Sequence, residues 1–120
     1  MKFAVTSQGL ELTSLVDPRF GRAKYFLVVD TETEETYAVD NTMNLNASQG
    51  AGIQAGKKVL DLGAQTVITG HMGPKAFATL QSGGVRIFTG ASGTVANAIE
   101  QFEAGDLNLA HAATTEGHWT

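Results

Sequence analysis

Cysteine is absent from this chain of 120 residues. The absence excludes disulfide bonds, zinc sites built on thiolates, iron–sulfur clusters ligated by protein thiolates and cysteine nucleophiles. A metal held by this chain therefore needs histidine, methionine, carboxylate or backbone ligands, or it needs ligands that arrive together with the metal.

The chain also lacks a long apolar run and an excess of positive charge. No stretch approaches the length of a membrane span, and the apolar start is too short for the core of a signal peptide, so we expect a cytoplasmic protein that does not enter a membrane. The chain has 12 acidic and 8 basic residues and a net charge of -4. This balance argues against a nucleic-acid partner, because non-specific binding of nucleic acid needs a basic face.

The composition is that of one folded domain. Hydrophobic residues make up 42% and charged residues 17% of the chain, which is ordinary for a globular protein of this length. Apolar periodicity and turn residues predict strands and helices in the order βββαβαβα. The predicted strands are 3–6, 25–30, 35–39, 66–69 and 85–88, and the predicted helices are 50–62, 74–81 and 94–103. This order predicts an α/β fold, a five-stranded mixed sheet flanked by helices, with the last two strands added in parallel.

The element order allows a ribonuclease-H-like arrangement, so nuclease chemistry has to be considered. Such enzymes hold two divalent ions between carboxylates, one of them on the first strand. Neither the first nor the fourth predicted strand carries a carboxylate. A Gly-x-Ser-x-Gly nucleophile motif is also missing, and Ser92 precedes a predicted helix, where it is a natural N-cap. We therefore assign no catalytic residue and expect a protein that is not an enzyme.

The most informative turn follows the fourth predicted strand. Residues 69–74 read Thr-Gly-His-Met-Gly-Pro, and proline favours the first position of the helix that comes next. A helix N-terminus attracts anions, and the carboxyl edge of a strand is where open α/β sheets bind ligands. This pattern indicates a ligand site that includes His71 and Met72. An ordinary turn in which His71 only caps a backbone group remains the alternative.

A positive cluster lies in the long loop predicted at residues 8–23 and just beyond it. Arg19, Arg22 and Lys24 follow Asp17, and loops of this length are usually functional or disordered. Arginine has planar donors and keeps its charge at all relevant pH values, so the cluster can serve as an anion clamp. A solvated loop with an ion pair to Asp17 is the alternative.

Glycines at residues 50, 52 and 56 superficially match a dinucleotide-binding fingerprint. They follow a polar loop after an antiparallel strand, and no acidic residue lies about twenty positions further on to hold a ribose. Tight helix packing, or close approach of the backbone to a ligand, explains these glycines better.

Together, three motifs resemble the nitrogenase iron–molybdenum-cofactor biosynthesis family. They are the Asp-Pro-Arg-Phe-Gly-Arg-Ala run at 17–23 with the strand at 25–30, the Gly-Ala-Gly at 50–52, and the turn at 70–77 with Gly93-Thr94-Val95. The resemblance covers residues 1–106 as one domain and leaves 107–120 as a tail, which we expect to be flexible. It implies a ribonuclease-H-like fold without nuclease carboxylates, as in stand-alone members from anaerobic bacteria.

The same resemblance implies a non-catalytic carrier for an anionic metal–sulfur cluster of the molybdenum–copper sulfide or iron–molybdenum type, held without covalent attachment. Inorganic sulfide then supplies the metal ligands, the protein supplies positive charge and N–H donors, and cluster donor or acceptor proteins are the expected partners. The alternative is a protein-interaction or regulatory module with a vestigial pocket. The candidate cofactor-binding residues, placed at the carboxyl ends of the parallel strands, are Arg19, Phe20, Arg22, His71, Met72, Gly73, Lys75, Gly90, Ser92, Gly93 and Thr94.

Overall fold

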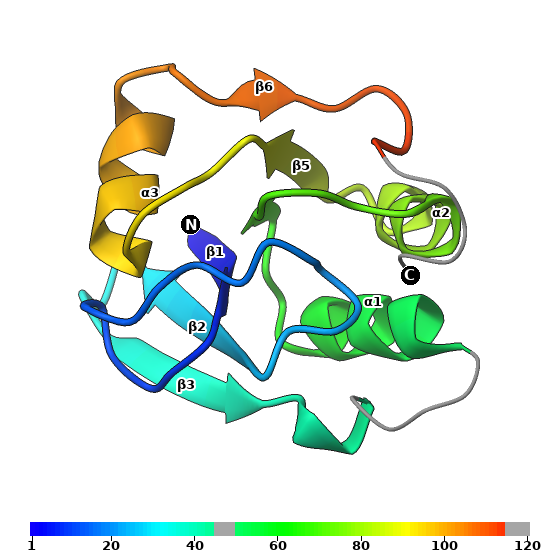
Figure 1. Ribbon diagram of the computed structural model, residues 1–120, viewed down its shortest axis with the longest axis horizontal. Helices are drawn as coiled ribbons and strands as arrows, with labels where there is room; N and C mark the ends of the chain where they lie inside the picture. Colours follow the sequence, from blue (N-terminus) through cyan, green and yellow to red (C-terminus); the bar gives the residue numbers. More distant parts are fainter. Residues whose placement is uncertain (45–49, 115–120) are drawn as a thin grey trace.

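The computed structural model describes residues 1–44 and 50–114 and has a mixed α/β architecture (Figure 1). In chain order its elements are β1 (Lys2–Ser7), β2 (Tyr25–Asp30), β3 (Thr36–Asp40), the 3-10 turn η1 (Thr42–Asn44), α1 (Ala51–Asp61), β4 (Thr66–Ile68), α2 (Pro74–Ser82), β5 (Arg86–Thr89), α3 (Val95–Glu103) and β6 (Asn108–Leu109). The predicted strands and helices are confirmed, with ends that differ by at most one residue.

One six-stranded sheet, in the order β3-β2-β1-β4-β5-β6, forms the centre of the molecule. The first three strands pair antiparallel, and β4 and β5 continue the sheet in parallel to β1. This is the pairing that the sequence predicts. Because β1, β4 and β5 run in the same direction, the loops that follow them emerge at one edge of the sheet.

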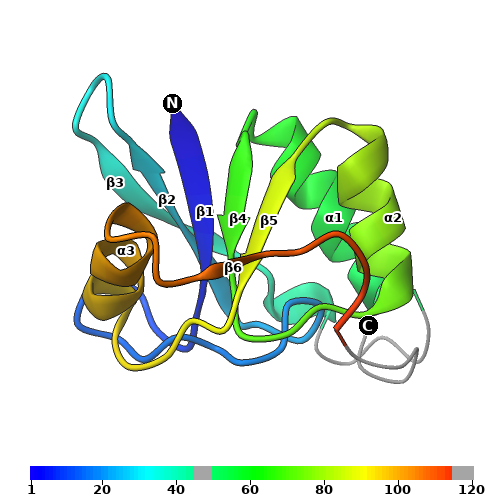
Figure 2. The ribbon, with the colours of Figure 1, turned by 90° about the horizontal axis from the view of Figure 1, so that it is seen from above.

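Helices cover both faces of the sheet (Figure 2). On one face, α1 and α2 pack over a core that includes Ala4, Phe26 and Val67. On the other face, α3 packs over Phe3, Val5 and Ile68. Successive residues of β1 thus point into opposite cores, as expected for a central strand that is buried on both sides.

The close approach of α1 to α2 explains one of the glycines. A Cβ at Gly56 would lie 2.9 Å from Cγ2 of Thr79 on α2, so the missing side chain lets the two helices approach. Helix packing, rather than a nucleotide, accounts for this position.

Two details of the prediction are wrong. The sheet has six strands rather than five, because β6 pairs antiparallel with β5. Two residues are too few to produce a visible periodicity, so the sequence carried no signal for this strand. The N-cap of α3 is Thr94 and not Ser92, since the Thr94 hydroxyl accepts the N–H of Asn97 and the Asn97 side chain accepts the N–H of Thr94.

The predicted tail at 107–120 is described as far as residue 114; residues 115–120 lie outside the described residues. The domain boundary at residue 106 and the ribonuclease-H-like classification stay predictions. Across residues 1–44 and 50–114, no helix has the length and apolar character needed to cross a membrane.

Candidate functional site

The loops that follow β1, β4 and β5 meet at one edge of the sheet, along the lower side of Figure 2. Buried threonines join the strand ends beneath them. The hydroxyl of Thr6 donates to the carbonyl oxygen of Asp17 at 2.7 Å and pairs with the hydroxyl of Thr69 at 2.9 Å. These bonds fix the loop after β1 on the turn after β4, so the edge has a rigid foundation.

The segment that carries Arg19 runs beside the turn that carries His71. The N–H of His71 donates to the carbonyl oxygen of Pro18 at 2.8 Å, and the N–H of Phe20 donates to the carbonyl oxygen of His71 at 3.2 Å. Arg19 and His71 thereby form a parallel β-bridge. The structure brings together two predicted site residues from distant parts of the sequence.

Gly70 permits this contact. A Cβ at position 70 would lie 2.8 Å from the carbonyl oxygen and 2.9 Å from the Cα of Pro18. Both neighbours are backbone atoms, which cannot rotate away as a side chain can. Only glycine therefore allows the two segments to lie this close.

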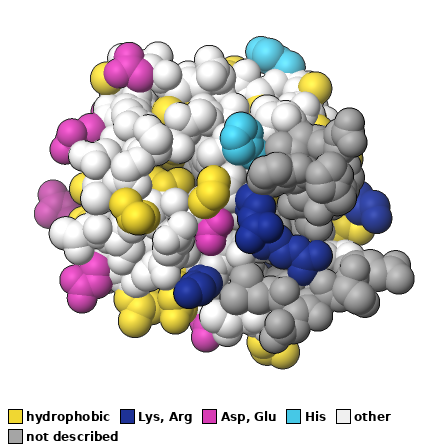
Figure 3. All heavy atoms as spheres, viewed as in Figure 1, with side chains coloured by type: hydrophobic (Ala, Val, Ile, Leu, Met, Phe, Trp, Pro, Cys, Tyr) yellow, Lys and Arg dark blue, Asp and Glu magenta, His cyan; other side chains and the backbone are white. Residues whose placement is uncertain are grey.

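Positive charge gathers at this edge. Figure 3 looks onto the carboxyl ends of the parallel strands and shows Lys and Arg side chains grouped beside a histidine, while Asp and Glu side chains lie mostly along the opposite side of the view. Arg19, Lys24, His71 and Lys75 are exposed, and Arg22 is half-buried. We call these five residues the cationic edge. On a chain with a net charge of -4, its four Lys and Arg side chains are a local concentration of the minority charge, and His71 adds an imidazole beside them.

A buried carboxylate lies under the cationic edge. Asp17 is 7% exposed, and burial raises its pKa above the ordinary value of 3.8, although the N–H groups and positive charges of Arg19 and Lys24 act in the opposite direction. Its Oδ1 accepts the N–H of Arg19 at 3.2 Å. Asp17 thus shapes the loop through backbone contacts rather than standing as an ion pair at the surface.

The turn after β5 lies against the turn after β4, as predicted, but its N–H groups are already used within the protein. Four of the five between Gly90 and Thr94 donate to described residues, namely Gly90 to Gly70 O (3.0 Å), Ala91 to Thr69 O (3.2 Å), Ser92 to Gln101 Oε1 (3.3 Å) and Thr94 to Asn97 Oδ1 (3.0 Å). An anion that used these donors would first have to break internal bonds.

The two helix N-termini at this edge differ. At the start of α3, the N–H groups of Val95 and Ala96 donate to the carbonyl oxygens of Ser14 and Leu12. At the start of α2, Gly73 is the N-cap and provides no side-chain cap. Among the described residues, no acceptor takes the N–H groups of Lys75 and Ala76. Within the described part of the chain, the N–H groups at the start of α2, beside His71, therefore have no acceptor, whereas those at the start of α3 are already bonded.

Two predicted site residues belong to the core. The side chains of Phe20 and Met72 are each 1% exposed and pack in the cluster beneath α1 and α2. The backbone of Met72 is held by Thr114, whose hydroxyl accepts its N–H at 2.8 Å. In this conformation the Met72 sulfur faces the core and not the cationic edge.

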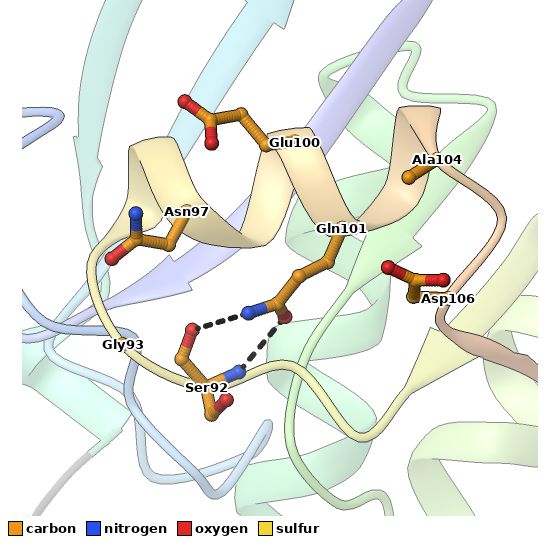
Figure 4. Close-up of a pocket in the computed structure, with 7 residues that line it drawn as sticks. All are labelled: Ser92, Gly93, Asn97, Glu100, Gln101, Ala104 and Asp106. Atoms are coloured by element: carbon orange, nitrogen blue, oxygen red, sulfur yellow. Dashed lines mark hydrogen bonds between the residues drawn. The ribbon is translucent and has the colours of Figure 1, made fainter.

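Ser92 and Gly93 face a different environment. They line an open hollow of about 380 Å³ together with Glu100, Gln101 and Asp106 (Figure 4). Gln101 reaches back to Ser92 and both donates to and accepts from its backbone, at 3.1 and 3.3 Å. The carboxylates at its rim make this hollow unsuited to an anion. The candidate side chains thus divide into the cationic edge, the core and this acidic hollow, while Gly73 and Thr94 are helix N-caps and Gly90 is bonded to the turn after β4.

The described residues hold no group of three or more His, Asp or Glu side chains that would form a metal site. A metal ion without its own ligands would find few protein donors here, whereas an anion with a complete ligand set would find positive charge and N–H groups.

Sequence reasoning missed the contribution of Thr114 and of the loop between β1 and Asp17. Leu10, Leu12 and Leu15 are exposed in that loop, although its backbone is bound to the start of α3. Their unusual apolar spacing in a polar loop was visible in the sequence. For Thr114 there was no signal, because its role depends on a contact with residue 72.

Fold and site together define a small mixed α/β domain with a cationic loop edge and no thiolate ligands. A family model described as dinitrogenase iron-molybdenum cofactor matches residues 1–105. The chain belongs to this family, as its sequence motifs had predicted.

Solved structures agree with this assignment, and one curated protein is also similar to the chain. The chain is 41% identical to the apo form of the orange protein from Desulfovibrio gigas, with coverage of 95% of this chain and 96% of that chain and a TM-score of 0.90. A Thermotoga protein proposed to be NifB is 34% identical, with coverage of 97% and 98% and a TM-score of 0.84. An uncharacterized protein from Methanocaldococcus jannaschii is 25% identical over 95 residues, 77% of this chain and 80% of that protein.

Proposed function

We propose that this protein binds an anionic metal–sulfur cluster at the cationic edge and carries it without covalent attachment. The observation that carries the proposal is the meeting of Arg19 with His71 at the edge where the N-terminus of α2 also opens. Family membership and the likeness to the orange protein support a cofactor carrier. A molybdenum–copper sulfide is our first choice of cargo, and an iron–molybdenum cluster is the second.

The available donors fit such a cargo. A preassembled metal sulfide satisfies its metals with inorganic sulfide, so the protein needs no cysteine. Sulfide at the surface of the cluster accepts hydrogen bonds from guanidinium, imidazole and backbone N–H groups, and bonds to charged partners are the stronger ones. The cationic edge offers these groups from two loops and one helix end.

We further propose that the protein carries its cargo and performs no catalysis. Neither β1 nor β4 presents a carboxylate, which supports the expectation that it does not hydrolyse nucleic acids with magnesium or manganese. Turnover by the folded protein well above that of a heat-killed sample would contradict this expectation.

Anaerobic reconstitution with tetrathiomolybdate and Cu(I) tests the carrier proposal. Charge-transfer absorbance measures the bound cluster, and titration gives its affinity. Arg19→Ala and Arg22→Ala should each weaken binding by about tenfold, since each removes a charged donor. Binding should also weaken as the salt concentration rises, because exposed charges are screened.

Lys57→Ala and Arg86→Ala are the matched controls. Each removes one positive charge from an exposed side chain, Lys57 on α1 and Arg86 at the amino end of β5, so the change in net charge is the same. If the controls lose as much affinity as Arg19→Ala, the cationic edge is not the binding site.

A second candidate function is supported by a different observation. The exposed Leu10, Leu12 and Leu15 lie on a loop whose backbone is held by α3, and fixed, exposed apolar side chains favour protein contacts. This observation supports an interaction or regulatory module with a vestigial pocket. Wild-type protein that gains no colour with tetrathiomolybdate and copper, while remaining folded, would favour this candidate over the carrier.

A further inference from the structure

The segment after α3 returns across the molecule from α3 to α2, along the open side of β5 (Figures 1 and 2). Its strand β6 pairs Leu109 with Phe88 and Asn108 with Thr89, and the N–H of Ala110 donates to the carbonyl oxygen of Ile87 at 2.8 Å. We call residues 107–114 the strap. It runs from the end of α3, along β5, to the turn that carries His71 and Met72.

The strap ends in a clamp on Met72. Thr114 Oγ1 accepts the N–H of Met72 at 2.8 Å and also donates to its carbonyl oxygen at 3.3 Å, while the N–H of Thr114 donates to the same carbonyl oxygen at 2.9 Å. One threonine thus binds both backbone groups of one residue. Ala110 and Ala113 pack against the core cluster that contains the Met72 side chain.

Elsewhere the strap is lightly held. Its strand has two residues, and Asn108, Leu109, His111 and Ala112 are exposed. Leu107 at its start packs against the core under α3, but beyond β6 the groups that it buries against the core are the alanines Ala110 and Ala113, which bury little apolar area. Segments with few buried contacts open at a much lower free energy than the whole domain unfolds. Among the contacts that the described residues show, the bonds of Thr114 are therefore the ones that hold this end of the strap on the turn at Met72.

We propose that the strap gates Met72 by holding the backbone of its turn, and that release of the strap lets the turn move, so that the thioether leaves the core and acts as a soft metal ligand next to His71. Closed, the gate leaves Met72 1% exposed; open, it adds a sulfur donor of the kind that Cu(I) prefers. In its last step the inference rests on the proposed function, because a copper-containing cargo gives the freed sulfur its use. The gate itself stands on the contacts of Thr114.

The rate of methionine oxidation measures how readily the gate opens, and this experiment needs no cargo. Hydrogen peroxide transfers one oxygen atom to an accessible thioether and leaves as water, so the rate of sulfoxide formation at each methionine reports its access. The chain contains its own references, since Met43 is 88% and Met1 38% exposed. In the wild-type protein, peptide mass spectrometry should find Met43 and Met1 oxidised well before Met72.

Thr114→Val removes the hydroxyl and keeps the shape, whereas Thr114→Ser keeps the hydroxyl. In the valine variant, hydrogen peroxide should oxidise Met72 about tenfold faster than in the wild type, and the oxidation rate of Met43 should not change. The reason is that the opening equilibrium of the strap sets the oxidation rate of Met72. The serine variant should behave like the wild type. An unchanged Met72 rate in Thr114→Val would overturn the gate. So would a loss of the free energy of unfolding in urea large enough to account for the faster oxidation of Met72, since that result reports global unfolding rather than release of the strap.

Titration with Cu(I) alone, in competition with a chromophoric chelator, tests the role of the sulfur. Thr114→Val should bind Cu(I) more tightly than the wild type, and the added substitution Met72→Leu, which keeps the volume, should abolish the gain. Equal Cu(I) affinity with and without Met72 would overturn the soft-ligand step. Failure of the carrier proposal looks different, because the tetrathiomolybdate assay then stays colourless whatever the oxidation rates are.

Discussion

Substitution of Gly70 by alanine tests whether backbone contact builds the cationic edge. The new Cβ would meet the carbonyl oxygen of Pro18 at 2.8 Å, its Cα at 2.9 Å and its carbonyl carbon at 3.2 Å. None of these atoms can move without the backbone. We expect the segment with Arg19 to separate from the turn with His71, which would break the two hydrogen bonds between them.

The magnitude follows from two contributions. Overpacking at a rigid, buried position costs about 1–3 kcal/mol, and each lost hydrogen bond adds about 1 kcal/mol. Since some of the strain is relieved when the bonds break, we expect the free energy of unfolding to fall by about 2–4 kcal/mol. Domains of this size have about 5–15 kcal/mol in total, so the variant should remain folded.

Urea unfolding followed by circular dichroism measures this loss. Gly83→Ala is the control, because its Cβ would meet Cδ2 of Leu60, the end of a side chain that can rotate, and its φ of -92° suits any residue. We expect a cost below about 1 kcal/mol there. Equal stability of the two variants would refute the argument that backbone contact at Gly70 holds the edge together.

Two further predictions follow from the N-cap of α3 and from the burial of Asp17. Thr94→Ala should reduce the free energy of unfolding by about 1 kcal/mol and leave cluster affinity unchanged, because the Thr94 hydroxyl is engaged by Asn97; a loss of affinity at unchanged stability in urea unfolding would contradict this. Burial raises the pKa of Asp17 above 3.8, so the folded state takes up this proton first and wild-type stability should rise relative to Asp17→Asn as pH falls through that raised pKa. Urea unfolding between pH 7 and pH 3 measures the difference, and a constant difference would contradict the role of burial.

Most of the fold was visible in the sequence because local signals agree with one another. The strand at 25–30 is dense in aromatic and β-branched residues, and the helix at 74–82 opens with proline. The meeting of Arg19 with His71 also followed from topology, since neighbouring parallel strands end at one edge. What stayed hidden depends on nonlocal partners. Nothing near Met72 indicates that its sulfur faces the core, and nothing near Gly90 indicates that its N–H is already bonded to Gly70.

The cationic edge is assembled from segments far apart along the chain. Arg19 meets His71, and Leu15 meets Thr94 at the start of α3, so both contacts wait until most of the chain has been synthesised. Such distant pairings form late, because loops must close before the contacts stabilise them. An incomplete chain therefore lacks the assembled cationic edge, which is the surface proposed to bind a cluster. On the proposed function, a cluster that binds only the folded molecule would also shift the equilibrium toward it, so each loaded copy would be a folded one.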